Sequence, residues 1–358
     1  MSINSLHLIA SKTLGGEERL FSWIVNALPE HDIKTHAVIR KHSAVANLLD
    51  AQDSHTETGF RTVWDPLSKF EIQNIIRKQK PDVVHTYMSR AARLTRNKKD
   101  HSYLHIAKLC GNYKARSFVH ADAWVVCTHW VADYLMAGGI SHKKIHIIPN
   151  FIKKPANVSQ QQAAAFRRQW QIPEDALLIG SVGRLVLVKN VSMLIQAFEE
   201  LPSEIHSRPL HLLIAGDGPL RNELEQTARQ LRRTQQIHFT GWLSQPEVAF
   251  AASDIMAFTS NREEGFGLAI LEAWAQHKPL ITTEALGPGE ITRHQVDAWR
   301  TPCDNPPMLA QGLLGLLQDP TLASSLADNG YQQYFSQYSE DVIIGRYADL
   351  YQSLLSHA

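Results

Sequence analysis

The stretch DIMAFTSNREEGFGLAILEAW, residues 254–274, joins a short apolar run to a glycine-containing polar loop and a second apolar run. The first run predicts a buried strand, and the second predicts a helix that begins at about Gly267. Gly265 and Gly267 leave the first backbone N–H groups of that helix unobstructed by side chains. Glu272 interrupts the apolar run, and Glu264 precedes it by eight positions. A carboxylate in an apolar helix needs a partner, so this segment predicts a binding site.

The same order of strand and helix recurs along the chain, which predicts parallel sheets covered by helices on both faces. The expected strands are 6–10, 35–39, 82–87, 123–128 and 144–150, then 177–183, 210–216, 237–241, 254–260 and 279–284. We interpret 153–175, which is polar and bounded by prolines, as a linker with a short helix. A chain of 358 residues exceeds what one core usually serves. We therefore expect an α/β protein of two doubly wound domains, 1–152 and 153–338, facing a central cleft.

The composition is that of a folded globular protein, with 44% hydrophobic and 20% charged residues. Three cysteines without a CxxC pair favour a reducing compartment over a disulfide framework or a zinc site. The first residues lack the long apolar core of a signal peptide, and no apolar run approaches the roughly 18 residues of a membrane span. These features predict a cytoplasmic protein, either soluble or peripheral on the plasma membrane.

The net charge of +1 conceals an asymmetry, because residues 1–150 carry 20 basic and 13 acidic side chains. The basic excess is densest between Arg77 and Arg116, where eleven Lys and Arg face only Asp82 and Asp100. This stretch is either a solvated face or a surface for an anionic partner such as membrane lipid, a phosphorylated glycan or nucleic acid. Sparse aromatic residues disfavour nucleic acid.

Ligands of doubly wound sheets bind beyond the carboxyl ends of the strands. Gly15 and Gly16 follow the first strand and precede a helix, where they form either a plain turn or a close approach to a ligand. The next residues do not complete a GxGxxG fingerprint, so a dinucleotide site is not expected. Arg184 and Lys189 follow the strand 177–183, and they are either surface charges or a grip on a diphosphate. Asp217 is predicted to cap the helix that follows it.

The spacing of Glu264 and Glu272 has a physical interpretation. Eight residues of helix span about 12 Å, which is of the order of the distance from a ribose to a sugar across a diphosphate. One carboxylate would accept bonds from ribose hydroxyls and the other from hexose hydroxyls, with the helix N-terminus at the diphosphate. The alternatives are a dipole-stabilising acid for Glu264 and a solvated face for Glu272.

Taken together, these segments resemble the retaining glycosyltransferases of family four, which have the GT-B fold. The matching pieces occur in the family's order: Gly15-Gly16, IPN (148–150), VGRLVLVKN (182–190), LLIAGDGPLRNELE (212–225), IHFTGWLS (237–244) and REEGFGLAILEAW (262–274). The last contains the family's Glu-x7-Glu motif at Glu264 and Glu272. The resemblance also implies that a final helix, at about 339–358, packs on the N-terminal domain.

The resemblance implies a role for each matching position. Glu272 would bind the donor ribose and Glu264 the donor sugar, while Arg184 and Lys189 would neutralise the diphosphate. The implied donor-binding set is Gly15, Gly16, Asn150, Gly183, Arg184, Lys189, Glu264, Gly265, Phe266, Gly267, Leu268 and Glu272. Arg184, Lys189 and Glu264 would also act in catalysis. The family's His-x-His pair becomes VVHTYMSRA here, so His85 is a further catalytic candidate and Tyr87 replaces the second histidine.

The expected activity is transfer of a hexose, with retention, from a nucleotide diphosphate sugar such as a UDP-sugar. The expected acceptor is a hydroxyl of a glycolipid, oligosaccharide or lipopolysaccharide, with a possible anionic membrane contact through 77–116. We expect no metal and no cofactor, since no Asp-x-Asp or HExxH motif occurs. The alternatives are a sugar-nucleotide epimerase or hydrolase of the same fold and a catalytically silent nucleotide-sugar-binding protein.

Overall fold

The computed structural model describes residues 2–50, 55–95, 103–109, 111 and 117–356. The chain divides into two compact units. Unit 1 consists of residues 1–153 together with 340–358, and unit 2 consists of residues 154–339. Unit 1 is therefore built from two separate parts of the sequence, and each unit is described below by itself.

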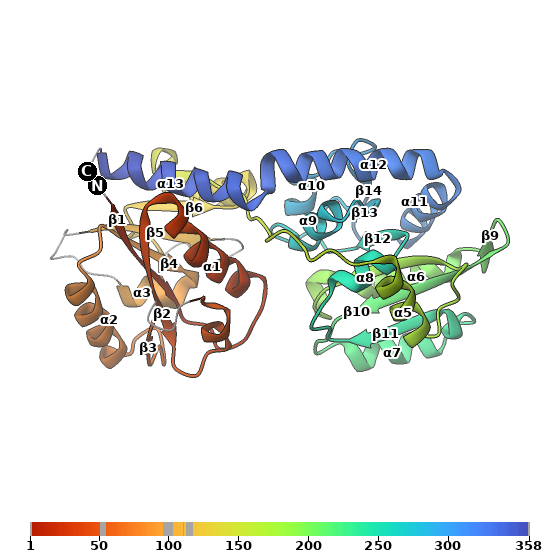
Figure 1. Ribbon diagram of the computed structural model, residues 1–358, viewed down its shortest axis with the longest axis horizontal. Helices are drawn as coiled ribbons and strands as arrows, with labels where there is room; N and C mark the ends of the chain where they lie inside the picture. Colours follow the sequence, from red (N-terminus) through yellow and green to blue (C-terminus); the bar gives the residue numbers. More distant parts are fainter. Residues whose placement is uncertain (1, 51–54, 96–102, 110, 112–116, 357–358) are drawn as a thin grey trace. The chain divides into compact units, whose positions relative to one another are not determined.

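Unit 1 contains a seven-stranded sheet in the order β3-β2-β1-β4-β5-β6-β7, with all neighbouring strands parallel (Figure 1). The strands are β1 (Ile3–Ile9), β2 (Ile33–Arg40), β3 (His55–Thr58), β4 (Val83–Tyr87), β5 (Leu104–Leu109), β6 (Ala123–Val126) and β7 (Ile145–Ile147). The helices are α1 (Gly16–Ala27), α2 (Pro66–Gln79), α3 (Met88–Thr95), α4 (His129–Ala137) and α13 (Glu340–Ser356).

Helices cover both faces of this sheet because successive side chains of a strand point to opposite faces. Ile9 of β1 belongs to a core cluster that includes residues of α1 and α13. Leu8, its neighbour, belongs to a second cluster formed with residues of α2 and α3. The continuous apolar strands thus build two cores, one on each face, as a doubly wound sheet requires.

Unit 2 contains a second parallel sheet in the order β11-β10-β8-β12-β13-β14, to which a short β9 adds in antiparallel. Its strands are β8 (Leu177–Val182), β9 (Glu204–Ile205), β10 (Arg208–Ala215), β11 (Ile237–Gly241), β12 (Ile255–Phe258), β13 (Leu280–Thr283) and β14 (Trp299–Thr301). The helices are α5 (Gln160–Gln169), α6 (Val191–Glu200), α7 (Arg221–Arg229), α8 (Glu247–Ala252), α9 (Leu268–Ala275), α10 (Leu286–Ile291), α11 (Pro306–Gln318) and α12 (Pro320–Gln333). The predicted fold class, two doubly wound parallel-sheet domains with a long C-terminal helix, is confirmed.

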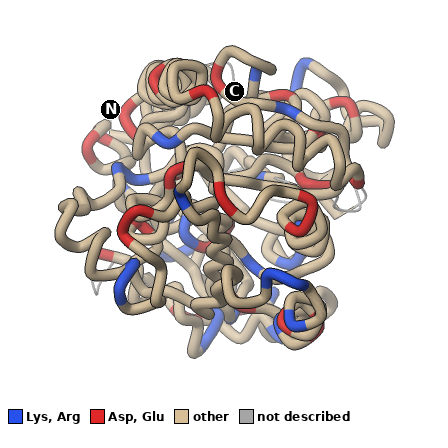
Figure 2. The backbone as a smooth tube through the Cα atoms, turned by 90° about the vertical axis from the view of Figure 1, so that its right-hand side faces the viewer, with Lys and Arg blue, Asp and Glu red and all other residues tan. Residues whose placement is uncertain are grey.

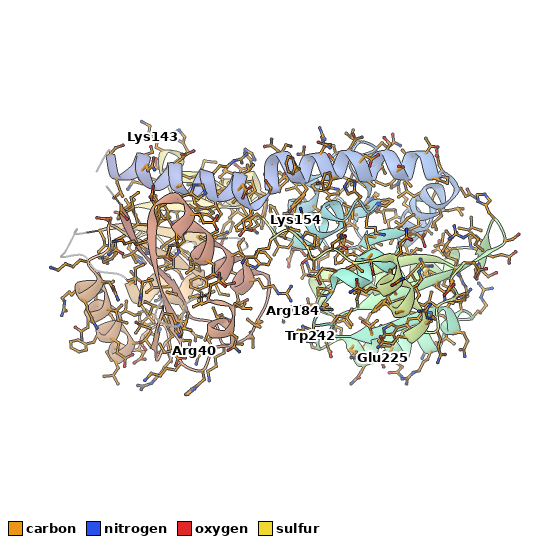
Figure 3. All side chains as sticks on the ribbon, viewed as in Figure 1. Arg40, Lys143, Lys154, Arg184, Glu225 and Trp242 are labelled. Carbon is orange, nitrogen blue, oxygen red and sulfur yellow. The ribbon has the colours of Figure 1, made fainter. Side chains whose placement is uncertain are left out.

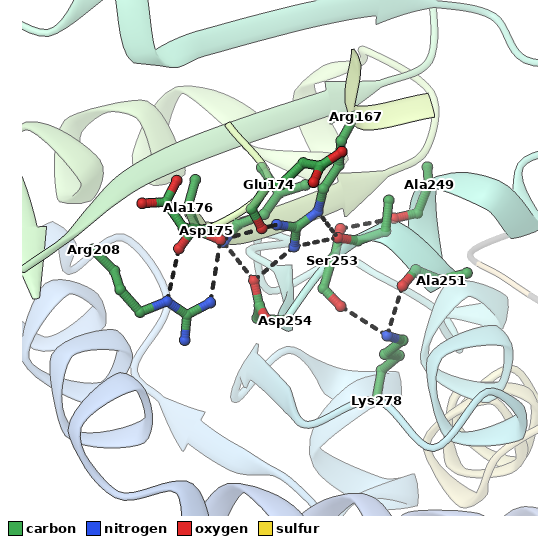
Figure 4. A network of polar contacts seen from close by, with 12 residues as sticks. Arg167, Glu174, Asp175, Ala176, Arg208, Ala249, Ala251, Ser253, Asp254 and Lys278 are labelled. Carbon is green, nitrogen blue, oxygen red and sulfur yellow. Dashed lines mark hydrogen bonds and ion pairs between the residues drawn. The ribbon is translucent and has the colours of Figure 1, made fainter. Parts of the chain in front are cut away.

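The short helix predicted within 153–175 is present as α5, but most of the segment belongs to unit 2 and is not a free linker. Ser159 caps α5 in a capping box, and Phe166 is buried against the sheet of unit 2. Arg167 donates from Nη1 to the carbonyl of Ala176 at 2.9 Å and from Nη2 to Asp254 at 2.9 Å (Figure 4). The segment is polar because its outer face is solvated, while one face of the helix packs on the domain.

Several short elements escape prediction from the sequence. After β2 the chain forms a 3-10 turn, Ala44–Leu48, rather than an α-helix. Strand β5 was not predicted, since His105 and Lys108 interrupt its apolar pattern although both side chains are buried. Among the described residues, no helix is both long enough and apolar enough to cross a bilayer.

Each sheet has one position where the chain order reverses. In unit 1 this switch point lies between β1 and β4, and in unit 2 it lies between β8 and β12. Loops diverge there to opposite faces and leave a crevice at the carboxyl ends of the strands. The segments that follow β8 and β12 are VGRLVLVKN and the loop before α9, the two most distinctive motifs of the sequence.

Candidate active site

Hydrogen bonds from the loop after β12 hold the loop after β8 at the switch point of unit 2. Thr259 donates from Oγ1 to the carbonyl of Asn190 at 3.0 Å. The backbone N–H of Asn261 donates to the carbonyl of Val188 at 2.8 Å. These bonds fix the backbone on both sides of Lys189, whose side chain then points at the second loop.

Lys189 and Glu264 form an ion pair in which the ammonium donates to Oε2 of the carboxylate. Ser260 donates to the same oxygen at 3.1 Å. The lysine side chain is 29% exposed and the glutamate 13%, so the pair is largely but not fully shielded from water. The sequence predicts these two residues as separate partners of a diphosphate and a sugar, and the structure brings them together across 75 positions of chain.

Arg184 lies on the same loop, five residues before Lys189, and its side chain is exposed. Figure 3 shows it projecting from unit 2. Among the residues that the structure describes, nothing pairs with its guanidinium. An exposed, permanently charged, planar group is suited to bidentate contact with phosphate oxygens.

Glycines allow the loops after β8 and β10 to pack backbone against backbone. A Cβ at Gly216, where φ is +142°, would lie 1.8 Å from the carbonyl oxygen of Gly183. The N–H of Gly183 in turn donates to Ala215 at 2.9 Å. Asp217, between these loops, does not cap α7 as predicted. It accepts from the N–H of Gly218 at 2.7 Å and from Arg221 at 3.2 Å, because α7 begins later, at Arg221 itself.

The Gly-Phe-Gly turn before α9 is supported from behind by α10. Gly287 donates its N–H to the carbonyl of Glu264 at 2.9 Å. A Cβ at Gly287 would lie 2.4 Å from the backbone of Gly265 and Phe266, so only glycine fits. Phe266 is buried, and Gly267 adopts the left-handed conformation (φ +94°) as the N-cap of α9. The N-cap residue has no side chain to cap that helix, so in the described part of the chain the N-terminus of α9 is suited to an anion.

The predicted distance from Glu264 to Glu272 needs correction. Helix α9 begins at Leu268, so residues 264–267 are loop, and only the four steps from Leu268 to Glu272 rise along a helix axis. Those steps account for about 6 Å rather than 12 Å. Glu272 itself is half-buried, one turn inside α9.

Two of the donor-binding candidates in unit 1, Gly15 and Gly16, lie at the start of α1. Gly15 is the N-cap of α1 in an extended conformation, and Gly16 is the first helical residue. Glu17 and Glu18 occupy the first turn of that helix, and a Cβ at Gly15 would lie 2.9 Å from a carboxylate oxygen of Glu18. This negative charge at the helix start disfavours a phosphate there, whereas it suits hydroxyl donors of a sugar.

Asn150 is buried, and its Oδ1 accepts from the ammonium of Lys108 at 2.9 Å. Lys108 is a fully buried cation of β5. A buried cation needs a polar partner, so the structure gives Asn150 a role in the stability of unit 1. We do not carry it into the donor site.

His85 is not beyond the strand, as the catalytic assignment requires, but inside β4 and fully buried. Its Nδ1 lies 2.6 Å from the hydroxyl of Tyr351 in α13, and its ring stacks on Tyr87 at 4.7 Å. Burial holds the pKa of His85 well below 6.5, so the ring is neutral. The sequence could not reveal this environment, because α13 lies 266 positions further along the chain. We do not retain His85 as a catalytic candidate.

The basic stretch 77–116 is not one surface. Lys108 is internal, and Arg90 donates to the carbonyl of Phe60 at 3.0 Å. The cations that are exposed or partly exposed in the described part are Arg77, Lys78, Lys80, Arg90 and Arg93. Arg96, Lys98, Lys99, Lys114 and Arg116 lie outside the described residues. Figure 2 marks the charged residues along the backbone in a side view of the molecule.

The residues that sequence reasoning missed are the polar ones that directly follow β12: Thr259, Ser260 and Asn261. Their signal was their position at the carboxyl end of a strand beside the switch point. Trp242, 67% exposed after β11, is a further missed residue at that edge (Figure 3). Among the described residues, no group of three or more His, Cys, Asp or Glu is placed to hold a metal ion.

Two family models match the chain in succession. The family described as Glycosyltransferase Family 4 matches residues 14–154, and the family described as Glycosyl transferases group 1 matches residues 162–333. Among curated proteins, the lipopolysaccharide core biosynthesis glycosyltransferases LpsE and LpsD of Rhizobium meliloti are 28% and 29% identical. The LpsE match covers 95% of this chain and 96% of that protein, and the LpsD match covers 95% of both.

Solved structures show the same fold. A glycosyltransferase from Rickettsia africae superimposes with a TM-score of 0.85 at 19% identity, over all of both chains. Anabaena HepE in complex with UDP and glucose superimposes with a TM-score of 0.84 at 18% identity, covering 98% of this chain and 100% of HepE. The paired family matches and the loops at the switch point of unit 2 agree, and the chain belongs to glycosyltransferase family 4, a family of retaining enzymes with the GT-B fold.

Proposed function

We propose that this chain transfers a hexosyl group, with retention, from a UDP-sugar to a hydroxyl group of a lipopolysaccharide-core or related glycolipid acceptor. The observation that carries the proposal is the convergence of Lys189, Glu264 and the uncapped start of α9 at the switch point of unit 2. The names of LpsE and LpsD support the acceptor class. The HepE complexes with UDP, with UDP-glucose and with UDP and glucose support the donor class.

In the proposed reaction, the bond between the anomeric carbon and the diphosphate oxygen breaks while a bond to the acceptor oxygen forms on the same face. The acceptor proton passes to an oxygen of the departing diphosphate, so UDP leaves and no further reactant is needed. Negative charge accumulates on the diphosphate in the transition state. Arg184, Lys189 and the N–H groups at the start of α9 would stabilise that charge, and the N–H groups are already held in place by the helix before the reaction begins.

The carboxylates and the glycines would position the donor. Glu264 would accept bonds from the sugar hydroxyls and Glu272 from the ribose, while the backbone of Gly265, Phe266 and Leu268 would donate to phosphate and sugar. Gly15 and Gly16 are proposed as further donor-binding residues. The ion pair gives this assignment a specific consequence: a donor must separate Lys189 from Glu264, because each then turns to a different part of the ligand.

The test is a panel of UDP-, GDP- and ADP-sugars in thermal-shift assays, followed by product analysis with and without a lipopolysaccharide-core acceptor. A donor at 100 times its Kd adds about 2.7 kcal/mol to stability, enough to raise the melting temperature measurably. We expect UDP-sugars to stabilise the protein and transfer to require the acceptor. Epimerised or free sugar as the main product when acceptor is present would instead favour the epimerase or hydrolase.

The assay also tests the role assigned to the cations. Arg184 and Lys189 would supply the positive charge at the diphosphate, so we expect transfer to continue in the presence of EDTA. Complete loss of transfer on chelation, restored by added divalent ions, would contradict this assignment. We propose that the enzyme works at the cytoplasmic face of the plasma membrane, where a lipid-linked acceptor of this kind is within reach.

A further inference from the structure

The start of α2 in unit 1 exposes three large apolar side chains. Trp64 is 77% exposed, Leu67 57% and Phe70 60%. Leu67 and Phe70 are neighbours at i and i+3 on the helix, and Trp64 precedes them by the same interval. The helix buries other residues, Ile72 and Ile76, in the core. We call Trp64, Leu67 and Phe70 the apolar patch, and exposed groups of this size mark interaction surfaces.

Cations accompany the patch. The guanidinium of Arg93, from α3, lies 4.1 Å from the ring centroid of Trp64. Segment 61–80 contains five basic residues: Arg61, Lys69, Arg77, Lys78 and Lys80. Arg77 follows Phe70 by seven positions, which places it on the same face of α2 two turns further on. The apolar patch therefore continues into a positively charged surface.

The two acidic residues of this segment are engaged within unit 1. Asp65 accepts from the N–H of Leu67 at 3.2 Å and from the hydroxyl of Ser68. Glu71 accepts from Thr58 and from the N–H of Gly59 at 3.2 Å. Both carboxylates are thus engaged by hydrogen bonds within unit 1, and the other charged residues of segment 61–80 are its five cations.

We propose that the apolar patch and its cations dock unit 1 on a bilayer surface that contains anionic lipid. Tryptophan and the apolar side chains enter the interfacial layer, where an indole ring is favoured, and Arg and Lys meet the lipid phosphates. Charge complementarity selects this occupant, because a zwitterionic or uncharged surface would engage only the three apolar residues. The contact thus involves residues 61–80 and Arg93 rather than the whole stretch 77–116. It does not depend on which sugar the enzyme transfers.

The experiment measures binding of the full chain to vesicles without any nucleotide sugar. Probes are vesicles of phosphatidylcholine alone and of phosphatidylcholine with phosphatidylglycerol, in a flotation assay at low and moderate salt. We expect binding to the anionic vesicles that weakens with salt. The triple variant Trp64→Ser, Leu67→Ser, Phe70→Ser should weaken it at least tenfold. A second triple variant replaces three cations: Lys69→Gln, Arg77→Gln and Lys78→Gln. It should weaken vesicle binding about 100-fold, because each cation contributes about fivefold.

Matched controls separate this surface from general effects. Phe335→Ser removes an aromatic side chain that is 61% exposed on unit 2. Arg168→Gln, Arg229→Gln and Arg232→Gln remove the same number of exposed charges from unit 2. Both controls should bind like the wild type. All variants should keep the melting temperature and the donor response of the wild type, which shows that they fold.

Three results would overturn the proposal: equal binding by wild type and both patch variants, equal binding to the two kinds of vesicle, or no vesicle binding by the wild type. Failure of the proposed function is a separate result, because donor binding and sugar transfer are measured without vesicles. If the chain binds anionic vesicles but no UDP-sugar, the proposed membrane surface stands and the proposed donor is wrong.

Discussion

Lys189 and Glu264 are the residues whose pairing most constrains the chemistry of unit 2. Each is held by the polar residues after β12, since Thr259 fixes the backbone next to the lysine and Ser260 bonds the carboxylate. The pair is partly exposed, so its own contribution to stability is small, about 1 kcal/mol or less. Its importance lies in the two charged groups that it offers to a donor, the ammonium of Lys189 and the carboxylate of Glu264.

Substitution Lys189→Ala should lower kcat/KM for transfer by about 10²- to 10³-fold, because a cation that stabilises the departing diphosphate is lost. The melting temperature should change little. Lys189→Arg should restore part of the rate. Arg168→Ala is a suitable control, since Arg168 forms an exposed ion pair with Glu174 elsewhere in unit 2. Transfer at the wild-type rate in Lys189→Ala would remove this residue from the site.

Substitution Ser260→Ala tests whether Ser260 positions the carboxylate of Glu264. Loss of a hydrogen bond to a charged group is worth about 1.5–3 kcal/mol, so we expect kcat/KM for the donor to fall about 10- to 150-fold. Ser253→Ala is the matched control, because Ser253 is buried in the same unit and donates to the carbonyl of Ala249 at 2.7 Å. Both variants should lose some stability. If they also lose the same activity, Ser260 acts only on stability.

At the scale of elements, the site depends on three loops that touch through their backbones. Gly216 and Gly218 let the loop after β10 approach the loop after β8, and Gly287 of α10 supports the turn before α9. Because the contacts are between main-chain atoms, no side chain can adapt to relieve a clash. The alternation of strands and helices in the sequence predicts these loops, but their mutual packing requires the strand order.

Substitution Gly216→Ala should destabilise unit 2 by several kcal/mol and reduce activity, because its Cβ meets a carbonyl oxygen and φ is strongly positive. Gly315→Ala is the matched control: no atom lies within 4 Å of the added Cβ, and Gly315 is inside α11. That control should gain about 0.5–1 kcal/mol. Urea unfolding of both variants makes the comparison, and equal stability of the two would contradict the packing argument.

At the scale of the whole molecule, the chain leaves unit 1 at residue 153, builds unit 2 and returns at residue 340 to complete unit 1. Helix α13 then covers a face of the first sheet that carries polar residues among apolar ones. His7 lies 3.1 Å from the hydroxyl of Tyr87, and His85 bonds Tyr351 of α13. Unit 1 therefore contains buried neutral histidines whose protonation opposes folding.

Stability should consequently fall below pH 6.5. Burial lowers the pKa of His7 and of His105 from 6.5 to about 3 and holds that of His85 well below 6.5. Between the folded and the unfolded pKa the unfolded chain binds more protons, so the contribution is complete above pH 6.5 and is lost as the pH falls. Each histidine removes about 1.4 kcal/mol per pH unit in that window.

Urea titrations at pH 7, 6 and 5 check this expectation, and His85→Leu should reduce the slope by the equivalent of one proton. An unfolding free energy that does not change between pH 7 and pH 5 would show that these rings are protonated in the folded state. The two units can unfold in separate steps, so the unfolding free energy of unit 1 is taken from its own transition at each pH.

The sequence by itself determined the architecture and the motifs. Apolar runs of strand length alternate with helical patterns, and this local periodicity reflects burial on both faces of a parallel sheet. The sequence also reveals the Glu-x7-Glu segment, the two cations after β8 and the glycines. Each is recognised by its residue type and by its position just after a predicted strand.

Only the tertiary structure decided which of these residues meet. It pairs Lys189 with Glu264, encloses His85 beneath α13, buries Lys108 against Asn150 and leaves Trp64 exposed. The physical reason is that the three contacts join segments that lie from 42 to 266 positions apart in the sequence. The exposure of Trp64 likewise depends on which other segments pack near it. Strand order and helix packing create them, and no local pattern in the chain encodes which strands become neighbours.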